Sequence, residues 1–351
     1  MNTIVFAGGG SMGHVIKHFA VMPYLEDKFS RFSFIGSKRG PEKNFIGSDH
    51  PFYSLTPARL DRSDPLSNIS LPLDFFKALK ESKDILKKEN PKVVFCGGGY
   101  VCFPVAVAAR SLNIPVVLHE SDYSLGLANK LCLPFCKAIL TTFPDTLKNN
   151  GKVRYVGALV RKELLDKNKT AAKARLKLDR SKKTLLVIGG SLGSKAINDC
   201  VVSSYEYLTK RYNVIHICGE KKTYDITPKG VLQMPFARDM ASVYAATDLA
   251  VSRCGSNTAF ELFACDIPTL FIPLSKRSSR GDQIENAKFF SERRACKTIS
   301  EEDLTPQTLV KAVNALENES MLISANMRSL IKSDANERAA KIITRYAFGE
   351  R

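Results

Sequence analysis

The sequence lacks a hydrophobic segment that could cross a bilayer, because none of its apolar runs reaches the roughly 18–20 residues that a transmembrane helix needs. The chain opens with an apolar stretch, residues 2–7, that is typical of a strand. Glycines follow it rather than a small-residue cleavage site, so we expect no signal peptide. Any contact with a membrane is therefore expected to be peripheral.

The sequence also lacks tryptophan and the spacing of a disulfide framework or a metal centre. Its nine cysteines are an odd number scattered through apolar stretches. The closest pair, Cys132 and Cys136, has no histidine nearby. We therefore predict no metal site and no cofactor, and the free thiols favour a reducing cytoplasm.

Acidic residues are too few to balance the basic ones. Lysine and arginine total 52 against 35 aspartates and glutamates, a formal net charge of +17. This excess favours an anionic partner such as nucleic acid, an anionic membrane surface or a nucleotide sugar, with an ordinary solvated surface as the alternative. The sequence has no helix-turn-helix, zinc or aromatic stacking signature, so we predict no nucleic-acid partner.

Short apolar runs alternate with helical stretches, which predicts an α/β fold of parallel strands covered by helices. The 351 residues exceed the length of most single cores, so we expect two domains, residues 1–158 and 159–351. A ligand is expected in the cleft between them, at the carboxyl ends of the strands. The stretch 335–346 predicts a closing helix that can pack on the first domain. The predicted strands are residues 3–7, 32–35, 93–96, 115–119 and 138–142, and then 184–188, 214–218, 249–252 and 269–272.

Gly8, Gly10 and Gly13 follow the first strand with the spacing G-x-G-x-x-G. Glycines let a backbone approach a ligand, and the start of the next helix favours negative charge. A dinucleotide site needs an acid at the end of the following strand, where this chain has Lys38 and Arg39. NAD is therefore disfavoured, and NADP remains a minor alternative.

His14 ends this loop. A neutral imidazole at a helix N-terminus has a lowered pKa and can accept a proton near neutral pH. His14 is thus a candidate general base, with a purely structural role as the alternative.

Two more glycine-rich turns follow predicted strands, at residues 97–99 and 189–194. For residues 97–99 we favour the approach of a ligand over strand–helix packing. In the second turn, Ser191 suits a diphosphate, as does Arg161 from the stretch between the two strand series. Glu261, on a helix after residues 253–258, can accept two hydrogen bonds from ribose hydroxyls. Surface roles for Arg161 and Glu261 are the alternatives.

Together these segments resemble the MurG family, the UDP-GlcNAc transferases of peptidoglycan synthesis. The resemblance spans nearly the whole chain and implies two Rossmann-like domains facing a cleft, the B-type glycosyltransferase fold. The acceptor would bind the N-terminal, membrane-side domain and UDP-GlcNAc the C-terminal domain. The stretches that carry it are residues 8–14, 97–104, 119–122, 126–129, 157–161, 189–194, 252–261 and 281–287.

The resemblance also implies roles for single residues. His14 would act as base in an inverting transfer of GlcNAc to the 4-hydroxyl of undecaprenyl-diphospho-MurNAc-peptide. The acceptor and its diphosphate would contact Ser11, Met12, Gly13, Gly98, Gly99, Tyr100 and Asp122. The donor would contact Arg161, Ser191, Phe236, Ala237, Ser256, Asn257, Thr258, Glu261, Asp282 and Gln283, with no metal ion.

The chain departs from the family pattern at three places. Lys17 and His18 stand shortly after the loop histidine, where the family often has proline. Asp122 replaces the asparagine that often follows His-Glu, and Asp282 replaces a glutamine and so removes a hydrogen-bond donor.

Residues 71–80 combine apolar bulk with lysines, and three further lysines follow by residue 88. This pattern favours peripheral docking on anionic lipid at the cytoplasmic face of the cell membrane, with an ordinary amphipathic helix as the alternative.

Three rival functions remain open at this point. Two share the expected fold: a lipid glycosyltransferase and a UDP-GlcNAc epimerase. The third, an NADP-dependent oxidoreductase, is less favoured because it leaves the motifs of the second half unexplained.

Overall fold

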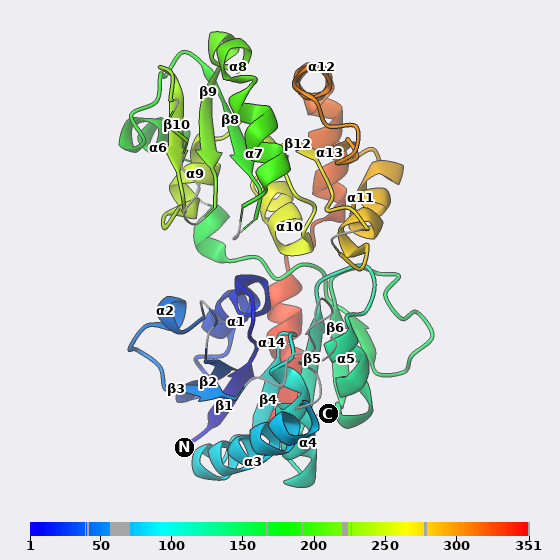
Figure 1. Cartoon of the computed structure of the whole chain (residues 1–351). Helices are drawn as coiled ribbons and strands as arrows, with labels where there is room; N and C mark the ends of the chain where they lie inside the picture. The colour runs from blue at the N-terminus through cyan, green and yellow to red at the C-terminus, as the bar shows by residue number, and fades with distance from the viewer. Residues whose placement is uncertain are drawn as a thin grey trace. The chain divides into compact units, whose positions relative to one another are not determined.

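The computed structural model describes residues 1–38, 40, 42–56, 71–165, 168–190, 193–219, 224–225, 227–276 and 279–349 (Figure 1). The chain forms two compact units, one of residues 1–159 with 333–351 and one of residues 160–332. The segment 333–351, which we had included in the C-terminal domain, thus groups with the first unit.

Seven parallel strands form the sheet of the first unit, in the order β3-β2-β1-β4-β5-β6-β7. Because parallel strands end at the same edge, the loops that follow β1, β4 and β5 emerge side by side. The strands are β1 (Thr3–Ala7), β2 (Arg31–Ser37), β3 (Phe52–Leu55), β4 (Val93–Cys96), β5 (Val116–Glu120), β6 (Ala138–Thr141) and β7 (Val153–Tyr155).

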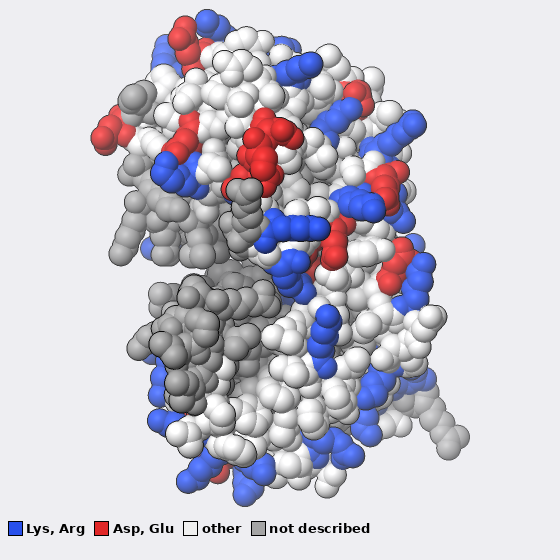
Figure 2. All heavy atoms as spheres, turned by 45° about the vertical axis from the view of Figure 1, so that its right-hand side comes forward, with Lys and Arg blue, Asp and Glu red and all other residues white. Residues whose placement is uncertain are grey.

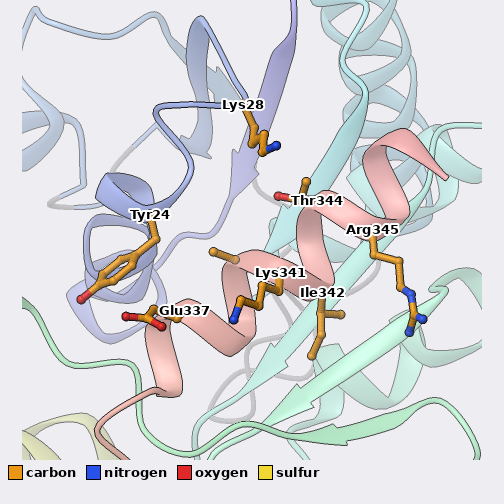
Figure 3. Close-up of a pocket in the computed structure, with 8 residues that line it drawn as sticks. Tyr24, Lys28, Glu337, Lys341, Ile342, Thr344 and Arg345 are labelled. Atoms are coloured by element: carbon orange, nitrogen blue, oxygen red, sulfur yellow. The ribbon is translucent and has the colours of Figure 1, made fainter. Parts of the chain in front are cut away.

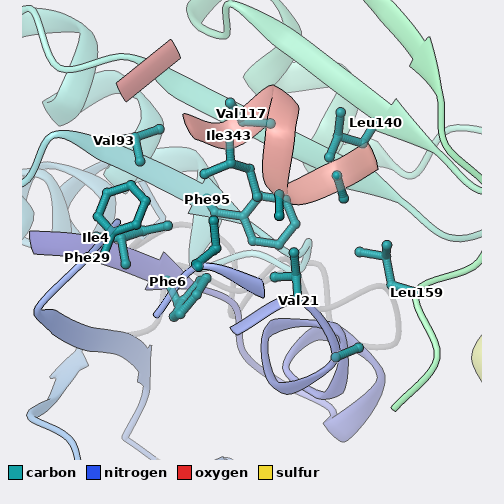
Figure 4. Packing of buried hydrophobic residues seen from close by; sticks show 14 of the residues in the cluster. Ile4, Phe6, Val21, Phe29, Val93, Phe95, Val117, Leu140, Leu159 and Ile343 are labelled. Atoms are coloured by element: carbon teal, nitrogen blue, oxygen red, sulfur yellow. The ribbon is translucent and has the colours of Figure 1, made fainter. Parts of the chain in front are cut away.

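Helices cover both faces of this sheet, which explains why its central strands are apolar throughout. Alternate residues of β1 enter different cores: Phe6 packs with Phe95 and Ile343 (Figure 4), whereas Val5 packs on the other face. The helical elements are η1 (Met12–His14), α1 (Ile16–Val21), η2 (Met22–Tyr24), α2 (Glu42–Ile46), α3 (Leu71–Glu89), α4 (Cys102–Ser111), α5 (Leu127–Cys132), η4 (Leu133–Phe135) and α14 (Ala335–Phe348).

The closing helix α14 packs on the first unit, against α1, η2 and β4. Its apolar face contributes Ala339 and Ile343 to the core, and Arg338 donates a hydrogen bond to the Tyr155 carbonyl at 3.2 Å. The expected helix therefore exists, and the packing that we considered for it is present.

The second unit repeats the arrangement with six parallel strands in the order β10-β9-β8-β11-β12-β13. Its strands are β8 (Lys183–Ile188), β9 (Tyr212–Ile217), β10 (Val231–Met234), β11 (Leu249–Ser252), β12 (Thr269–Phe271) and β13 (Lys297–Thr298). Its helical elements are η5 (Lys162–Leu165), α6 (Lys169–Arg175), α7 (Lys195–Val202), α8 (Tyr205–Arg211), α9 (Met240–Ala246), α10 (Ser256–Ala264), α11 (Asp282–Glu292), α12 (Pro306–Asn318) and α13 (Ser320–Leu330).

All nine predicted strands are present, and the four that we missed are the edge strands β3, β7, β10 and β13. These strands are short and mostly half-buried, whereas the central strands are buried along almost their whole length. An edge strand has one neighbour only, so its sequence carries a weaker apolar signal. Among the described residues, no helix is long and apolar enough to span a bilayer.

A carboxylate at the end of α3 ties that helix to two strands of the first sheet. The buried Glu89 accepts hydrogen bonds from Arg31 Nε at 2.8 Å and from Ser33 Oγ at 2.6 Å, both on β2. Tyr53 of β3 also donates to it. The bond from Arg31 is the main reason that the pKa of Glu89 is lowered to about 2.

We predict that Glu89→Gln destabilises the protein by about 2 kcal/mol at pH 7, because it removes a partly buried ion pair with Arg31 and weakens two hydrogen bonds to a buried carboxylate. A lowered folded-state pKa contributes stability above the unfolded-state value and loses it as the pH falls. The difference in the free energy of unfolding between wild type and Glu89→Gln should therefore shrink as the pH falls from about 4.5 to 2. Urea unfolding followed by circular dichroism at pH 7 and pH 3 measures it.

The matched control is Glu206→Gln, because Glu206 is exposed and pairs with Lys210 within one helix. That change should leave the urea midpoint nearly unaltered at both pH values. An equal loss of stability for Glu89→Gln at pH 7 and pH 3 would contradict the electrostatic explanation.

Candidate active site

The two glycine loops of the first unit, residues 8–14 after β1 and 97–100 after β4, are interlocked through their backbones. Gly97 N donates to the Ala7 carbonyl at 2.8 Å. A Cβ atom on Gly97 would lie 2.2 Å from the His14 carbonyl oxygen, and one on Gly99 would lie 2.2 Å from that of Gly9. Only glycine allows such a close approach, and Gly99 also has a φ of +84°.

This packing requires glycine at residues 97 and 99 whether or not a ligand approaches, so the ligand role that we favoured for residues 97–99 stays a prediction. The remaining member, Gly98, has a φ of +105°, and a Cβ there would lie 2.8 Å from His14 Nδ1. The three glycines therefore allow the backbone of residues 97–99 to pack directly against His14.

The His14 side chain is half-buried and hydrogen-bonded to the Gly97 carbonyl. Its pKa is lowered to about 4, mainly because burial disfavours the imidazolium and secondly because of the charge of Lys17. His14 ends η1 and precedes α1, which begins two residues later, so the helix-terminus effect that we expected stays a prediction. At neutral pH the ring is uncharged and able to accept a proton.

A charged cluster that we did not predict lies beside this histidine. Lys17 is 1% exposed, and its Nζ donates to Ser121 Oγ in the loop after β5. Burial lowers the pKa of Lys17, and the charges of Glu120 and Asp122 oppose that shift. The sequence signal for this cluster was a lysine near the start of a largely apolar helix. We had noted Lys17 only as a departure from the family pattern.

The other residues predicted for the acceptor lie around the same loops. Ser11, Met12 and Gly13 are half-buried in the first glycine loop. Tyr100 lies against its Gly10, since a Cβ there would approach the Tyr100 ring to 2.7 Å. The structure thus brings the loop residues and Asp122 to one edge of the first sheet. Of the two cations considered for NADP, Lys38 Nζ lies 3.5 Å from Thr56 Oγ1, and Arg39 lies outside the described residues.

A cavity of about 510 Å³ elsewhere in the first unit is not part of this site (Figure 3). The Lys28 carbonyl on its wall accepts a hydrogen bond from Asn2, just before β1, so the cavity lies toward the amino end of that strand. The glycine loops lie at the carboxyl end. The cavity is lined by Tyr24, Lys28, Glu337, Ala340, Lys341, Ile342, Thr344 and Arg345.

In the second unit, the buried Glu261 of α10 meets two polar side chains, the buried Tyr244 of α9 and the mostly buried Arg161. Glu261 accepts a hydrogen bond from Tyr244 at 3.1 Å through one carboxylate oxygen and from Arg161 at 3.4 Å through the other. Burial raises the pKa of Glu261, and the positive charge of Arg161 opposes that rise. The structure therefore joins two predicted donor residues, Arg161 and Glu261, and adds Tyr244, which sequence reasoning missed.

A second cluster that we missed supports the glycine loop at residues 189–194. Arg253 donates to Ser194 Oγ at 2.7 Å and to the carbonyls of Ile272 and Pro273 at 3.0 and 3.1 Å. It also pairs with Glu301. The guanidinium thus links the loop after β8 to the segment after β12. Ser191, the predicted diphosphate ligand of this loop, lies outside the described residues.

The remaining predicted donor residues follow the carboxyl ends of β10, β11 and β12. Phe236 is 49% exposed, whereas its neighbour Ala237 is buried. Gln283 accepts a hydrogen bond from Leu274 N at 3.0 Å through its side-chain oxygen, which leaves its amide hydrogens for other contacts. The others are Ser256, buried in the first turn of α10, and the half-buried Asn257, Thr258 and Asp282.

Metal-ligating side chains do not gather at either edge. Among the residues that the structure describes, no group of three or more histidines, cysteines, aspartates or glutamates could hold a metal ion.

Comparison with known proteins agrees with this two-unit arrangement. The N-terminal domain of glycosyltransferase family 28 matches residues 4–141, and its C-terminal domain matches residues 184–345. The chain is 39% identical over 347 residues to the UDP-N-acetylglucosamine--N-acetylmuramyl-(pentapeptide) pyrophosphoryl-undecaprenol N-acetylglucosamine transferase of Staphylococcus aureus strain MRSA252. The match covers 96% of this chain and 97% of that enzyme. The chain belongs to the MurG family.

Solved structures show the same fold. MurG from Acinetobacter baumannii superposes with a TM-score of 0.76 at 24% identity, covering 98% of this chain and all of that one. The calicheamicin glycosyltransferase CalG4 gives 0.70 at 14% identity, over 99% and 98% of the two chains. A UDP-GlcNAc 2-epimerase from Neisseria meningitidis gives 0.67 at 12% identity, over 98% and 100%. The epimerase shares the architecture, whereas the full-length sequence identity makes this MurG-family chain an N-acetylglucosaminyltransferase of peptidoglycan synthesis.

We predict that Tyr244→Phe weakens UDP binding about fivefold, because Glu261 loses the hydrogen bond that orients one of its carboxylate oxygens. Isothermal titration calorimetry with UDP measures the change. A matched control is Tyr212→Phe, which removes a 2.6 Å bond to Glu317 at the amino end of β9, away from the loops. UDP affinity that falls equally in both variants would show that the loss is not specific to Glu261.

Proposed function

We propose that this transferase moves GlcNAc from UDP-GlcNAc to the 4-hydroxyl of undecaprenyl-diphospho-MurNAc-peptide, converting lipid I to lipid II with inversion at the anomeric carbon. The observation that carries this proposal is the 39% identity over nearly the full length of the Staphylococcus aureus enzyme, whose name states that donor and that acceptor.

The acceptor half of the reaction is proposed for the first unit. The 4-hydroxyl oxygen bonds to the anomeric carbon, the bond from that carbon to the UDP phosphate breaks, and the hydroxyl proton passes to His14. The neutral state of the His14 ring supports this role. Residues Ser11, Met12 and Gly13 of the first glycine loop, Gly98, Gly99 and Tyr100 of the second, and Asp122 would hold the acceptor and its diphosphate.

The donor half is proposed for the second unit. Arg161 and Ser191 would bind the diphosphate, helped by the positive N-terminal ends of α7 and α10. Arg161 Nε and Ser256 Oγ are buried and have no hydrogen-bond partner among the described residues, which supports a role for both as donors to a bound ligand.

The same unit offers groups for the remaining parts of the donor. Glu261 would accept hydrogen bonds from the ribose hydroxyls, and Phe236 and Ala237 would hold the uracil. The start of α11 would contact the GlcNAc hydroxyls through Asp282 and Gln283, and the start of α10 would add Asn257 and Thr258.

We expect wild-type protein to convert a lipid-linked muramoyl-peptide acceptor to product with UDP-GlcNAc. His14→Ala should lower kcat by roughly a hundredfold or more, because the 4-hydroxyl then lacks its proposed proton acceptor. Product is measured with radiolabelled donor after extraction into butanol. UDP-GlcNAc affinity should stay unchanged in this variant, which serves as the control for folding of the donor half.

Two results would count against these assignments separately. Turnover of His14→Ala within about threefold of wild type would remove His14 as the base. Wild-type protein that forms UDP-N-acetylmannosamine and transfers no sugar would favour the epimerase alternative over the transferase itself.

Peripheral membrane contact is proposed for helix α3. Leu73 and Phe76 on this helix are 75% and 65% exposed, and lysines of the same helix surround them. Phe75, in contrast, is half-buried and stacks on Phe103 with 4.9 Å between ring centroids, so it belongs to the fold. On the face of the first unit that Figure 2 shows, Lys and Arg side chains are frequent and acidic ones rare. Exposed apolar bulk among cations is the arrangement that binds anionic bilayers.

We predict that the double change Leu73→Ser and Phe76→Ser reduces binding to phosphatidylglycerol-containing vesicles at least fivefold, since it removes apolar area that would enter the bilayer. Vesicle sedimentation measures the bound fraction. The matched control is Met321→Ser with Leu322→Ser, an exposed apolar pair on α13 of the second unit. Equal losses in both variants, or none in the first, would contradict docking through α3.

A further inference from the structure

The buried ammonium of Lys17 has no task in the reaction as proposed above. A buried charge is costly unless it is paired and hydrogen-bonded, so its presence requires an explanation. Lys17 lies in the first turn of α1, three residues after His14.

The partners of Lys17 all lie in the loop after β5. Its Nζ donates a hydrogen bond to Ser121 Oγ. Burial lowers the pKa of Lys17, and the carboxylates of Glu120 and Asp122, on either side of Ser121, oppose that shift. Glu120 is itself held in place, because it accepts hydrogen bonds from the backbone of Asp122 and Gly126 at 3.1 and 2.9 Å. The side chain therefore joins the start of α1 to a rigid acidic loop.

The charged groups around His14 come from three elements. Lys17 of α1 disfavours the imidazolium, while Asp122 of the loop after β5 and Glu42 of α2 favour it. The fourth polar neighbour is the Gly97 carbonyl, an uncharged acceptor. His18, next to Lys17, is buried and its pKa is lowered well below the ordinary value, so it adds no charge.

We propose that Lys17 is a positioning residue of the acceptor site, whose buried ammonium, anchored to Ser121, offsets the carboxylate of Asp122 and adds to the effect of burial in keeping the His14 imidazole neutral. Asp122 acts in the opposite sense, because its carboxylate attracts a proton to the same ring. Removing the lysine charge alone leaves Asp122 and Glu42 without an opposing charge beside His14, so protonation of the ring becomes easier. Removing the aspartate charge as well reverses that effect.

The protonation state of His14 can be followed without any assay of transfer. The chain has five histidines, so the ring carbons of ¹³C-labelled histidine can be assigned one by one in NMR titrations. We compare wild type with Lys17→Met, Asp122→Asn and the double variant between pH 5 and 8. Met has nearly the volume of lysine without its charge.

Each substitution is expected to shift the His14 titration in a defined direction. His14 in wild type stays neutral to about pH 5, and Lys17→Met moves its titration to higher pH. Asp122→Asn leaves the ring neutral throughout this range, and adding it to Lys17→Met moves the titration back toward wild type. His216 is the internal control, because it is buried in the second unit and burial alone lowers its pKa to about 4. Its signal should not move in any variant.

The pH dependence of kcat/KM is the second readout. This readout rests on the proposed role of His14 as the base. The acid limb of the kcat/KM profile reports the free-enzyme base. The ratio of kcat/KM at pH 7.5 to that at pH 5 should therefore rise about threefold in Lys17→Met and fall back in the double variant. Each variant is checked at each pH by circular dichroism.

Each outcome decides one point. The inference about Lys17 is overturned if the variants fold and the His14 titration is the same in all of them as in wild type. If Lys17→Met does not fold, Lys17→Gln replaces it, and a His14 titration there that is identical to that of wild type also overturns the inference. A titration that shifts as expected while the kcat/KM profile does not follow it supports the inference, and it removes His14 as the base.

Discussion

The close approach of two backbone loops at one edge of the first sheet is the constraint on which the rest of the acceptor region depends. Gly97 and Gly99 lie so near the carbonyls of the first glycine loop that no side chain fits between them. Because these loops follow adjacent parallel strands, the sheet itself sets their separation. His14, packed against the second loop, is therefore partly shielded from water, and its pKa is lowered mainly by that burial and secondly by the charge of Lys17.

In the second unit, charged and polar side chains, rather than close backbone packing, hold the loops at the carboxyl edge of the sheet. Arg253 reaches from the end of β11 to Ser194 on one side and to two carbonyls after β12 on the other. Tyr244 and Arg161 hold one oxygen each of Glu261. A buried carboxylate with two partners keeps one orientation, which is the condition for recognising a ligand by hydrogen bonds. The two units thus share a topology and differ in how they stabilise the loops at its carboxyl edge.

Much of the architecture was predictable because parallel strands buried on both faces are apolar throughout. Every central strand was found on that basis, and each of the four edge strands was missed, since half-burial on short segments leaves no clear pattern. Candidate residues directly after strands were placed correctly at the strand ends. Their partners were not, because Tyr244, Arg253 and Lys17 lie in stretches whose local sequence shows no site.

The amino-acid sequence by itself determined the class of the fold, the two series of strands, the family and the loops that follow the strands, because periodicity and short motifs are local properties. Only the tertiary structure decided that residues 333–351 return to the first unit, that the glycine run at 97–99 is required by packing, and that Lys17 is buried among acids. These features depend on contacts between residues about 80 to more than 300 positions apart, and a one-dimensional pattern does not contain such distances.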